Sequence, residues 1–229
     1  MKSRTLTLIV LSALVVASLL LSGCVEEDRV VYGNGEFASR TVELTPEALS
    51  GALEFTGQVD LEVILSTEAP RLEVSGDSNL VGSMETRVNS DGVLVVGSRR
   101  GERLHPEQPF DARLFVTDLH EVVLVGQGDL RIQSQRAENF EVTIVGSGDI
   151  EMRGATGRLE AVIVGSGSLR AREFQAREAE ITLVGSGDVE VCALDLLTVE
   201  LVGSGSIDSY CRPGRSERNL VGFGEFRQH

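Results

Sequence analysis

The sequence predicts an all-β fold, a single-domain parallel β-helix (a solenoid) with coils of about 19 residues and a Gly-x-Gly corner in each coil. The first observation is a motif, Val-Gly-x-Gly-x followed by an apolar residue, whose successive copies start 20, 19, 20, 18 and 19 residues apart. The copies begin at Val125, Val145, Val164, Val184, Val202 and Val221. The second observation is that apolar and polar residues alternate on both sides of each motif, which is the period of a strand.

Columns of equivalent residues identify the side chains that should face inward. One position before the motif Val stand Leu124, Ile144, Ile163, Leu183, Leu201 and Leu220. Five positions after it stand Leu130, Ile150, Leu169, Val189, Ile207 and Phe226. We expect these columns to stack as apolar ladders on either side of a corner, where Gly tolerates positive φ. In the last copy Arg218 stands at an otherwise apolar position, which predicts a polar coil capping the solenoid.

Two further columns should face outward. Six positions after the motif Val, four of the five neighbouring pairs are opposite in charge, in the series Arg131, Glu151, Arg170, Glu190, Asp208 and Arg227. Such pairs stabilise adjacent strands, so the alternation favours direct stacking of repeats. Four positions before the motif Val, the series is instead acidic: Glu121, Glu141, Glu160, Glu180, Thr198 and Glu217. Stacked like charges repel, so this Glu column is either screened by Arg136, Arg158, Arg177 and solvent, or it binds a divalent cation or a basic partner.

The N-terminal half has the same β-rich alternation with a less regular repeat. Tyr32–Phe37 matches the last motif at four of six positions and is interpreted as a diverged opening copy. Apolar residues alternate between Val42 and Val96, and Asp91-Gly92 marks a turn. The segment Arg99–Pro109 is predicted to be an irregular loop and is the second place, after the Glu column, where function is expected.

The N-terminus has the pattern of a bacterial lipoprotein signal peptide. Two basic residues precede an apolar run of about 16 residues, which is short for a membrane-spanning helix, and Ser22-Gly23-Cys24 follows. We therefore expect a signal peptide at 1–23, lipidation of Cys24, a tether at 24–31 and the β-helical domain at 32–229. The alternatives are an ordinary signal peptide or an uncleaved anchor. A lipid on Cys24 would place the protein in the cell envelope, on the outer membrane where the source has two membranes.

Composition limits the partners. Removal of 1–23 would leave 19 basic and 35 acidic residues, a net charge of −16. This charge argues against nucleic acid, which is bound by cationic contacts, and against anionic lipid headgroups. A protein or glycan partner and the membrane reached through the lipid remain the expected partners, with self-association through sheet faces or coil ends as a further hypothesis.

The remaining cysteines, Cys192 and Cys211, each stand ten residues before a motif Val. Stacked coils would bring them about 4.8 Å apart, within reach of a disulfide in an exported protein. The alternative is a pair of thiols that point away from each other.

The chain carries few residues suited to catalysis. The Gly-Ser-Gly corners lack the third Gly and the following helix of a dinucleotide site, and they do not have the spacing of a nucleophile elbow or of calcium-binding nonapeptide repeats. The three histidines are scattered, no Trp is present, and no Cys/His metal cluster is recognisable. We expect no cofactor and no metal. A polysaccharide-cleaving β-helix enzyme is the alternative function.

Taken together, the Gly-Ser-Gly-Asp repeats, Gly33-Asn34-Gly35, the segment Gly76–Leu80 and the turn Asp91–Leu94 resemble the bacterial auto-transporter adhesin head, or GIN, domain. The resemblance covers about Val30 to Phe226. It implies an exported, β-helical, non-catalytic domain, often on a lipoprotein, and it brings no catalytic residues. The leading expectation is an envelope-anchored binding or scaffold module, in adhesion or envelope assembly.

Overall fold

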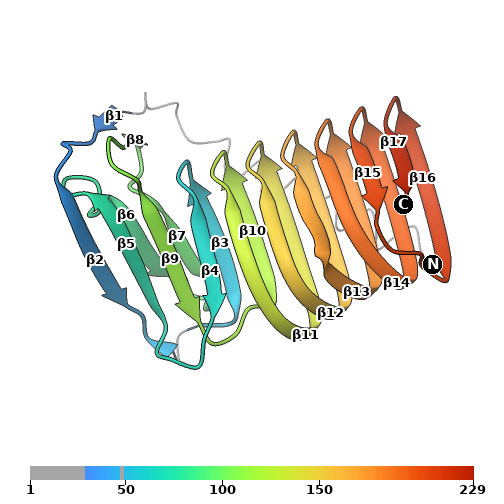
Figure 1. Ribbon diagram of the computed structural model, residues 1–229, viewed down its shortest axis with the longest axis horizontal. Coiled ribbons are helices and arrows are strands. Elements are labelled where there is room, and N and C mark those ends of the chain that lie inside the picture. Colours follow the sequence, from blue (N-terminus) through green and yellow to red (C-terminus); the bar gives the residue numbers. More distant parts are fainter. Residues whose placement is uncertain (1–28, 47–48) are drawn as a thin grey trace.

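The computed structural model describes residues 29–46 and 49–229 and, within them, all side chains except those of 134–136. Every element that these residues form is a β-strand, and the strands make one 15-stranded sheet and a separate two-stranded pair (Figure 1). Within the same ranges, no helix is long and apolar enough to cross a membrane. The predicted all-β solenoid is confirmed.

The C-terminal half is the regular part of the solenoid. Its strands are β10 (Glu121–Gly126), β11 (Leu130–Gly146), β12 (Ile150–Gly165), β13 (Leu169–Gly185), β14 (Asp188–Gly203), β15 (Ser206–Ser209), β16 (Arg215–Gly222) and β17 (Glu225–Gln228). All of their pairings with one another are parallel, and the motif Val and Gly of one coil lie opposite those of the next. Each strand from β11 to β14 continues from one corner through the outer bend to the next corner. The segments of variable length are absorbed by shifts of register, as between Gln133 and Arg136.

The Gly-x-Gly corners stack by backbone contacts. At Gly185 φ is +139°, and a Cβ atom there would collide with the carbonyl oxygen of Gly165 in the preceding coil. The close approach lets the N–H of Ser186 donate to the same oxygen at 2.9 Å. Ser204 repeats the bond to Gly185, also at 2.9 Å. Only Gly combines the positive φ with this approach, so the repeated Gly is structural.

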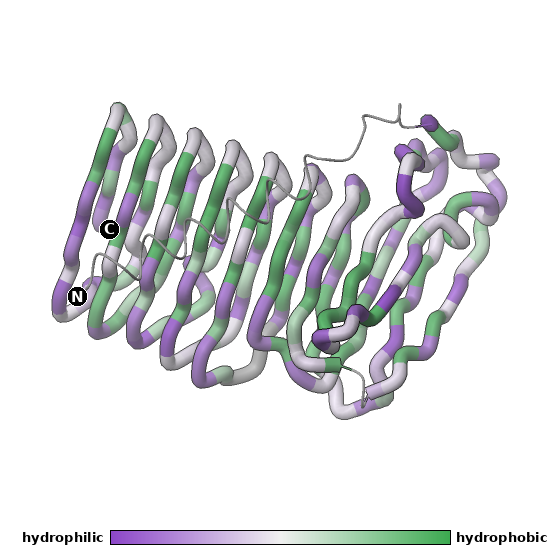
Figure 2. The backbone as a smooth tube through the Cα atoms, turned by 180° about the vertical axis from the view of Figure 1, so that it is seen from behind, coloured by the Kyte–Doolittle hydropathy of each residue, from purple (hydrophilic) through white to green (hydrophobic). Residues whose placement is uncertain are grey.

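The predicted inward columns form the core. Their members in the central coils are fully buried, and Figure 2 shows the alternation of hydrophobic and hydrophilic positions along each coil. Further core packing comes from two rings outside these columns, Phe140 of β11 and Phe174 of β13, which meet edge to face with centroids 5.5 Å apart. Full burial of a side chain of this size contributes about 1.5–3 kcal/mol, so the stacked ladders are the main source of stability.

The column of alternating charge is also in register, so Arg131, Glu151 and Arg170 lie opposite one another on successive coils. One pair of the expected ladder forms an ion pair, Arg227 with Asp208 at 3.5 Å, but the other arginines of the column have different partners. Arg170 pairs with the corner residue Asp149 at 2.7 Å, and Arg131 pairs with Asp60 at 3.5 Å.

The N-terminal half departs from the coil pattern. Its strands are β1 (Arg29–Tyr32), β2 (Phe37–Glu43), β3 (Ala52–Gly57), β4 (Leu61–Leu65), β5 (Arg71–Asp77), β6 (Met84–Val88), β7 (Leu94–Ser98), β8 (Glu102–His105) and β9 (Asp111–Val116). Strands β3 and β4 extend the parallel coils, but β5 is antiparallel to both β2 and β9, and β6 is antiparallel to β7. Figure 1 shows this antiparallel group closing the end of the solenoid opposite to β16 and β17.

Three predictions for this half are therefore wrong in detail. Tyr32–Phe37 is not an opening coil: its glycines connect β1, which pairs with β8, to the antiparallel strand β2. The segment Arg99–Pro109 is not wholly irregular, because β8 lies within it, and residues 29–31 of the predicted tether belong to β1. Alternation with period two is common to parallel and antiparallel strands, so it could not reveal the antiparallel pairing of this half.

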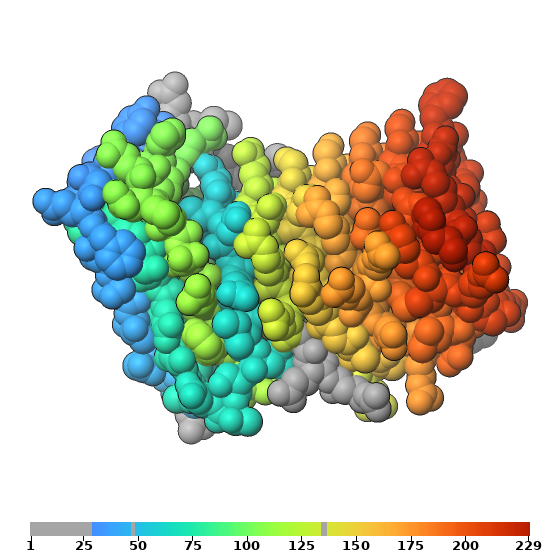
Figure 3. Space-filling view, viewed as in Figure 1, coloured from blue at the N-terminus to red at the C-terminus, as the bar shows by residue number. Residues whose placement is uncertain are grey.

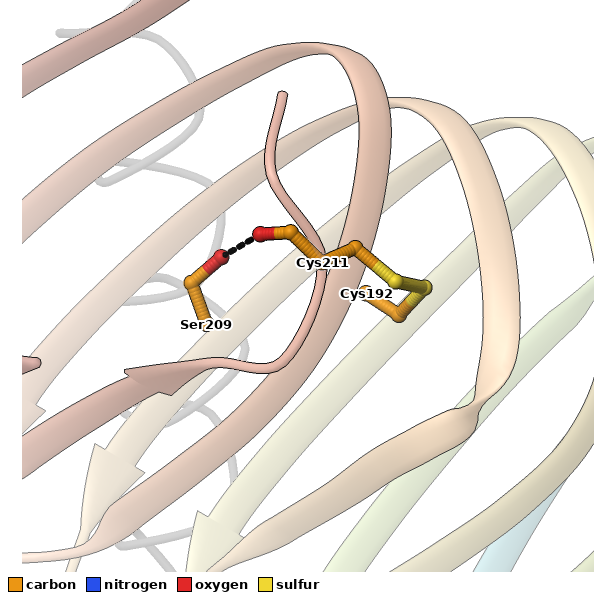
Figure 4. The surroundings of a disulfide bond; sticks show 3 residues. All are labelled: Cys192, Ser209 and Cys211. Atoms are coloured by element: carbon orange, nitrogen blue, oxygen red, sulfur yellow. Dashed lines mark hydrogen bonds between the residues drawn. A yellow bond between two sulfur atoms is a disulfide. The ribbon is translucent and has the colours of Figure 1, made fainter. Parts of the chain in front are cut away.

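The last coil forms an open end, and the guanidinium of Arg218 lies 4.2 Å from the ring centroid of Phe226, over an apolar ladder. Nearby, a disulfide joins Cys192 and Cys211, whose Cα atoms are 4.7 Å apart, and the Ser209 hydroxyl donates to the Cys211 carbonyl at 2.9 Å (Figure 4). The bridge links β14 to the segment between β15 and β16, so it ties the terminal coil to the body of the solenoid.

Candidate functional site

The Glu column is an acidic row on the outer face of the first strand of every coil. Its members lie directly opposite one another in the strand register: Glu121, Glu141, Glu160, Glu180, Thr198 and Glu217. Glu121, Glu141, Glu160 and Glu180 are each followed by a buried residue, which turns the carboxylate outward. The coils follow one another without interruption in the space-filling view (Figure 3), so the faces they form are long and continuous.

The repulsion within this row is only partly offset. Arg158 donates from Nη2 to Glu180 at 2.6 Å and lies 3.5 Å from Glu178. Partial burial, followed by the negative charges of Glu180 and Glu141, raises the pKa of Glu160, while Arg158 acts in the opposite direction. Of the other two arginines expected to screen the row, Arg136 has a side chain outside the described set, and Arg177 pairs with no acid of the described residues.

The acidic row does not have the form of a metal site. Across 29–46 and 49–229, no three His, Cys, Asp or Glu side chains are grouped so that they could hold a metal ion. Neighbouring carboxylates are spread along the solenoid at the strand spacing of about 4.8 Å, one to each coil. Such a linear array can attract a basic partner along its length.

A groove of about 630 Å³ lies on the outer face where the coils meet the antiparallel strands. In one outward row of side chains, Val125, Thr56, Gly97 and Glu85 lie opposite one another across β10, β3, β7 and β6. Gly97 has no side chain, so the row is interrupted there. A Cβ atom at this position would collide with the carbonyl and hydroxyl oxygens of Thr56, so the gap is built into the packing of β3 against β7.

Charged side chains of both signs form the walls of this groove. Arg99 lies between two acids, 2.9 Å from Glu85 and 3.5 Å from Glu102. Oε2 of Glu102 is buried and has no hydrogen-bond partner, the one side-chain atom of the described residues in this condition. Arg87 and Arg100 also line the groove, and neither makes a hydrogen bond or ion pair with any described residue. The groove thus presents two guanidinium groups that have no partner among the described residues, together with the acids Glu54 and Glu85.

A buried carboxylate that the sequence did not reveal holds this end of the molecule together. Asp77 is fully buried and accepts hydrogen bonds from the backbone N–H groups of Gly35 (2.7 Å), Glu107 (2.9 Å) and Gln108 (3.0 Å). The bond from Gln108 and then those from Gly35 and Glu107 lower the pKa of Asp77, against the effect of burial. The only signal in the sequence was its position after an alternating strand, beside Gly76.

The other residues singled out from the sequence are not brought together. Cys24, the expected lipidation site, lies outside the described residues. His105 lies against Tyr32, His120 lies 3.3 Å from Asp118, and His229 lies 2.8 Å from Asp208 at the far end of the solenoid. The three imidazoles therefore do not form a common site.

A comparison of the sequence with known protein families found a match. Residues 51–213 match the family model described as "Putative auto-transporter adhesin, head GIN domain". No curated protein sequence matches the chain.

Solved structures of similar fold include proteins from Bacteroides and Parabacteroides species. A "putative adhesin" from Bacteroides fragilis has a TM-score of 0.68 at 16% identity, over 87% of this chain and 100% of the other. A "putative lipid binding protein" from Parabacteroides distasonis has a TM-score of 0.59 at 23% identity, over 88% of this chain and 100% of the other. A "putative adhesin" from Parabacteroides merdae has a TM-score of 0.52 at 18% identity, over 87% of this chain and 99% of the other. At these identities the likeness concerns the fold.

Proposed function

Since the chain belongs to the family of auto-transporter adhesin head GIN domains, we propose that it is a non-enzymatic, envelope-anchored binding module that engages a partner through its long outer faces. The observation that carries this proposal is the acidic row from Glu121 to Glu217, held in register along the coils. Solenoids commonly use extended surfaces of this kind for binding.

Repulsion within the row supports a basic partner. Glu141, Glu160 and Glu180 are adjacent, and among the described side chains one arginine, Arg158, bonds within the group. A partner with Lys or Arg side chains at a similar spacing would relieve the remaining repulsion and would be drawn to the face over a distance. The unrelieved repulsion favours a protein partner with a basic surface, in adhesion or envelope assembly, over a partner with a neutral surface.

The proposal includes export and anchoring through a lipid on Cys24. The signal-like segment at 1–23 and the cysteine that follows it support this part. Mass spectrometry of the membrane-extracted protein should find a diacylglyceryl-modified Cys24 at the new N-terminus. An unmodified N-terminus at another residue would contradict it.

Adhesion can be tested with cells that display the full-length chain. Replacement of Glu141, Glu160 and Glu180 by Gln should weaken adhesion to host cells or to partner bacteria. The matched control replaces Glu151, Glu173 and Glu190 by Gln, which makes the same change of net charge elsewhere on the coils. An equal loss with both triple variants would show that only net charge matters and would refute a specific acidic face.

The alternative function, a carbohydrate-cleaving enzyme, is tested by turnover. The full-length protein is incubated with polysaccharides, and new reducing ends are measured. Turnover that persists in the triple Glu variant and is lost on substitution of residues in one local cluster would overturn the non-enzymatic proposal.

A further inference from the structure

We propose that the groove around Gly97 is a second binding site, whose ligand is an acidic oligosaccharide, one bearing uronate or sulfate groups. This inference deepens the proposed binding function and rests on it, but it concerns a different face region from the Glu column. It follows from the shape of the groove, its two arginines that pair with no described residue, its acidic acceptors and its neutral polar side chains.

The shape suits a chain that lies across the sheet. The floor consists of Gly97 and the neighbouring Val95, with the corner glycines Gly57 and Gly126 at one side. Because Gly97 interrupts an outward row of side chains, the hollow crosses the strands. Backbone N–H and C=O groups of β3, β7 and β10 are already used in ladders with their neighbours on both sides. The edge strand β6, which among the described strands pairs with β7 alone, is the place beside the groove where a peptide could add as a strand, and such a peptide would lie along β6 and not across the hollow.

The charged walls select an acidic ligand that also carries hydroxyl groups. Arg87 and Arg100 make no ion pair with the described residues, so they are available for a carboxylate or sulfate. The carboxylates of Glu54 and Glu85 on the same walls can accept hydrogen bonds from ligand hydroxyls. Uronate and sulfated sugars carry both kinds of group on one short unit.

The remaining polar lining fits sugar hydroxyls. Thr56, Gln58, Ser98 and Gln127 contribute hydroxyl and amide groups, each of which both donates and accepts. The residues that line the groove include no aromatic ring, so stacking on a neutral sugar face has no platform here. Affinity must then come from the acidic groups, which predicts weak or no binding of neutral oligosaccharides.

Titration calorimetry of the full-length protein in detergent tests this assignment with four probes. These are tetragalacturonate, a sulfated tetrasaccharide, neutral cellotetraose and a tetraglutamate peptide. We expect binding of at least one acidic sugar, with affinity that falls as salt is raised. The double variant R87A/R100A should weaken it at least tenfold. The matched control R177A/R212A, which removes two exposed arginines from the coils, should change it less than twofold.

Several outcomes would overturn the inference. These are no binding of either acidic sugar, equal binding of cellotetraose, tighter binding of tetraglutamate, or equal loss in the two double variants. Failure here is distinguishable from failure of the proposed function. If cells adhere through the Glu column while the purified protein binds no acidic sugar, only the ligand assigned to the groove is refuted. If the protein binds an acidic sugar at the groove but confers no adhesion, only the adhesive role is refuted.

Discussion

The substitution Glu160→Gln tests whether the acidic row is held against repulsion. Glu160 lies between Glu141 and Glu180 in the strand register, and burial and both of these charges raise its pKa. Gln has nearly the same size and removes the charge. We therefore expect the free energy of unfolding at pH 7 to increase, which is unusual for a substitution of a half-buried residue.

The size of the gain follows from the pairs that are removed. Two like-charged pairs across adjacent strands each cost about 0.2–1 kcal/mol, and both disappear in the variant. Arg158, which is bonded to Glu180 at 2.6 Å, already offsets a part of this repulsion. The net gain should therefore be about 0.5–1 kcal/mol, and it should shrink as salt is raised because the row is open to solvent.

The pH dependence has a definite sign. The pKa of Glu160 is raised in the folded state, so the ionised group costs stability above that folded-state pKa. Below the unfolded-state value of about 4.3, Glu160 is protonated in both states and the cost is absent. The stability difference between variant and wild type should thus be present at pH 7 and should vanish near pH 3.5.

Urea denaturation monitored by circular dichroism at both pH values measures the effect. The matched control is Glu151→Gln in the same strand, because Glu151 is bonded to Arg153 at 2.9 Å and has an arginine opposite it in each neighbouring coil. The control should lose up to about 1 kcal/mol at pH 7. A loss of stability in Glu160→Gln at pH 7, or changes of the same sign in the two variants, would refute the reasoning.

Three more predictions concern the ends and corners of the solenoid. The variant C192S/C211S should lose about 3 kcal/mol of unfolding free energy, because the disulfide closes a loop between residues 19 apart. The loss should be seen as faster hydrogen exchange in β16, and unchanged exchange would contradict it. Gly185→Ala should lower the free energy of unfolding, measured by thermal denaturation, by on the order of 2–3 kcal/mol, because φ is +139° and a Cβ atom would collide with the preceding corner. The control Gly82→Ala should be nearly neutral, because there is open space around Gly82. Equal effects of the two substitutions would count against the corner geometry. The pKa of Asp77 is lowered in the folded state, so its ionised form stabilises the fold above about pH 3.9, and this contribution is lost as pH falls through the folded-state pKa. The variant D77N should therefore be less stable than the wild type at pH 7, and its stability should depend less on acid. Parallel profiles of unfolding free energy against pH for the two proteins would show that Asp77 does not titrate in this way.

The regular half of the solenoid could be predicted because the same structural requirements recur in every coil. Every coil needs the same corner and the same inward columns, so each feature occurs several times in the sequence and its spacing identifies it. The stacking of Glu141, Glu160 and Glu180 followed directly from that count. Most of the ion pairs, apart from Asp208 with Arg227, did not follow, because a long flexible side chain such as Arg170 can reach the corner acid Asp149 as readily as the acid opposite it.

The N-terminal half could not be predicted in the same way because its decisive contacts occur once. The antiparallel pairing of β2 with β5 is accompanied by hydrogen bonds from separate segments to the buried carboxylate of Asp77. A single Asp after an alternating strand is indistinguishable in sequence from a surface residue. The match of Tyr32–Phe37 to the last motif was for the same reason misleading, since Gly-x-Gly serves a turn here and a stacked corner elsewhere.

The same distinction separates structure from binding in this molecule. A residue repeated in every coil is explained by stacking, as the carbonyl contacts of Gly185 show, and so the repeated Val-Gly-Ser-Gly motif needs no ligand. A feature that stacking does not explain is one that works against stability. The Glu column is of this kind, because it repeats a charge that its own neighbours repel. It costs stability that the coils could have kept with neutral residues, and the proposed binding of a basic partner would account for that cost.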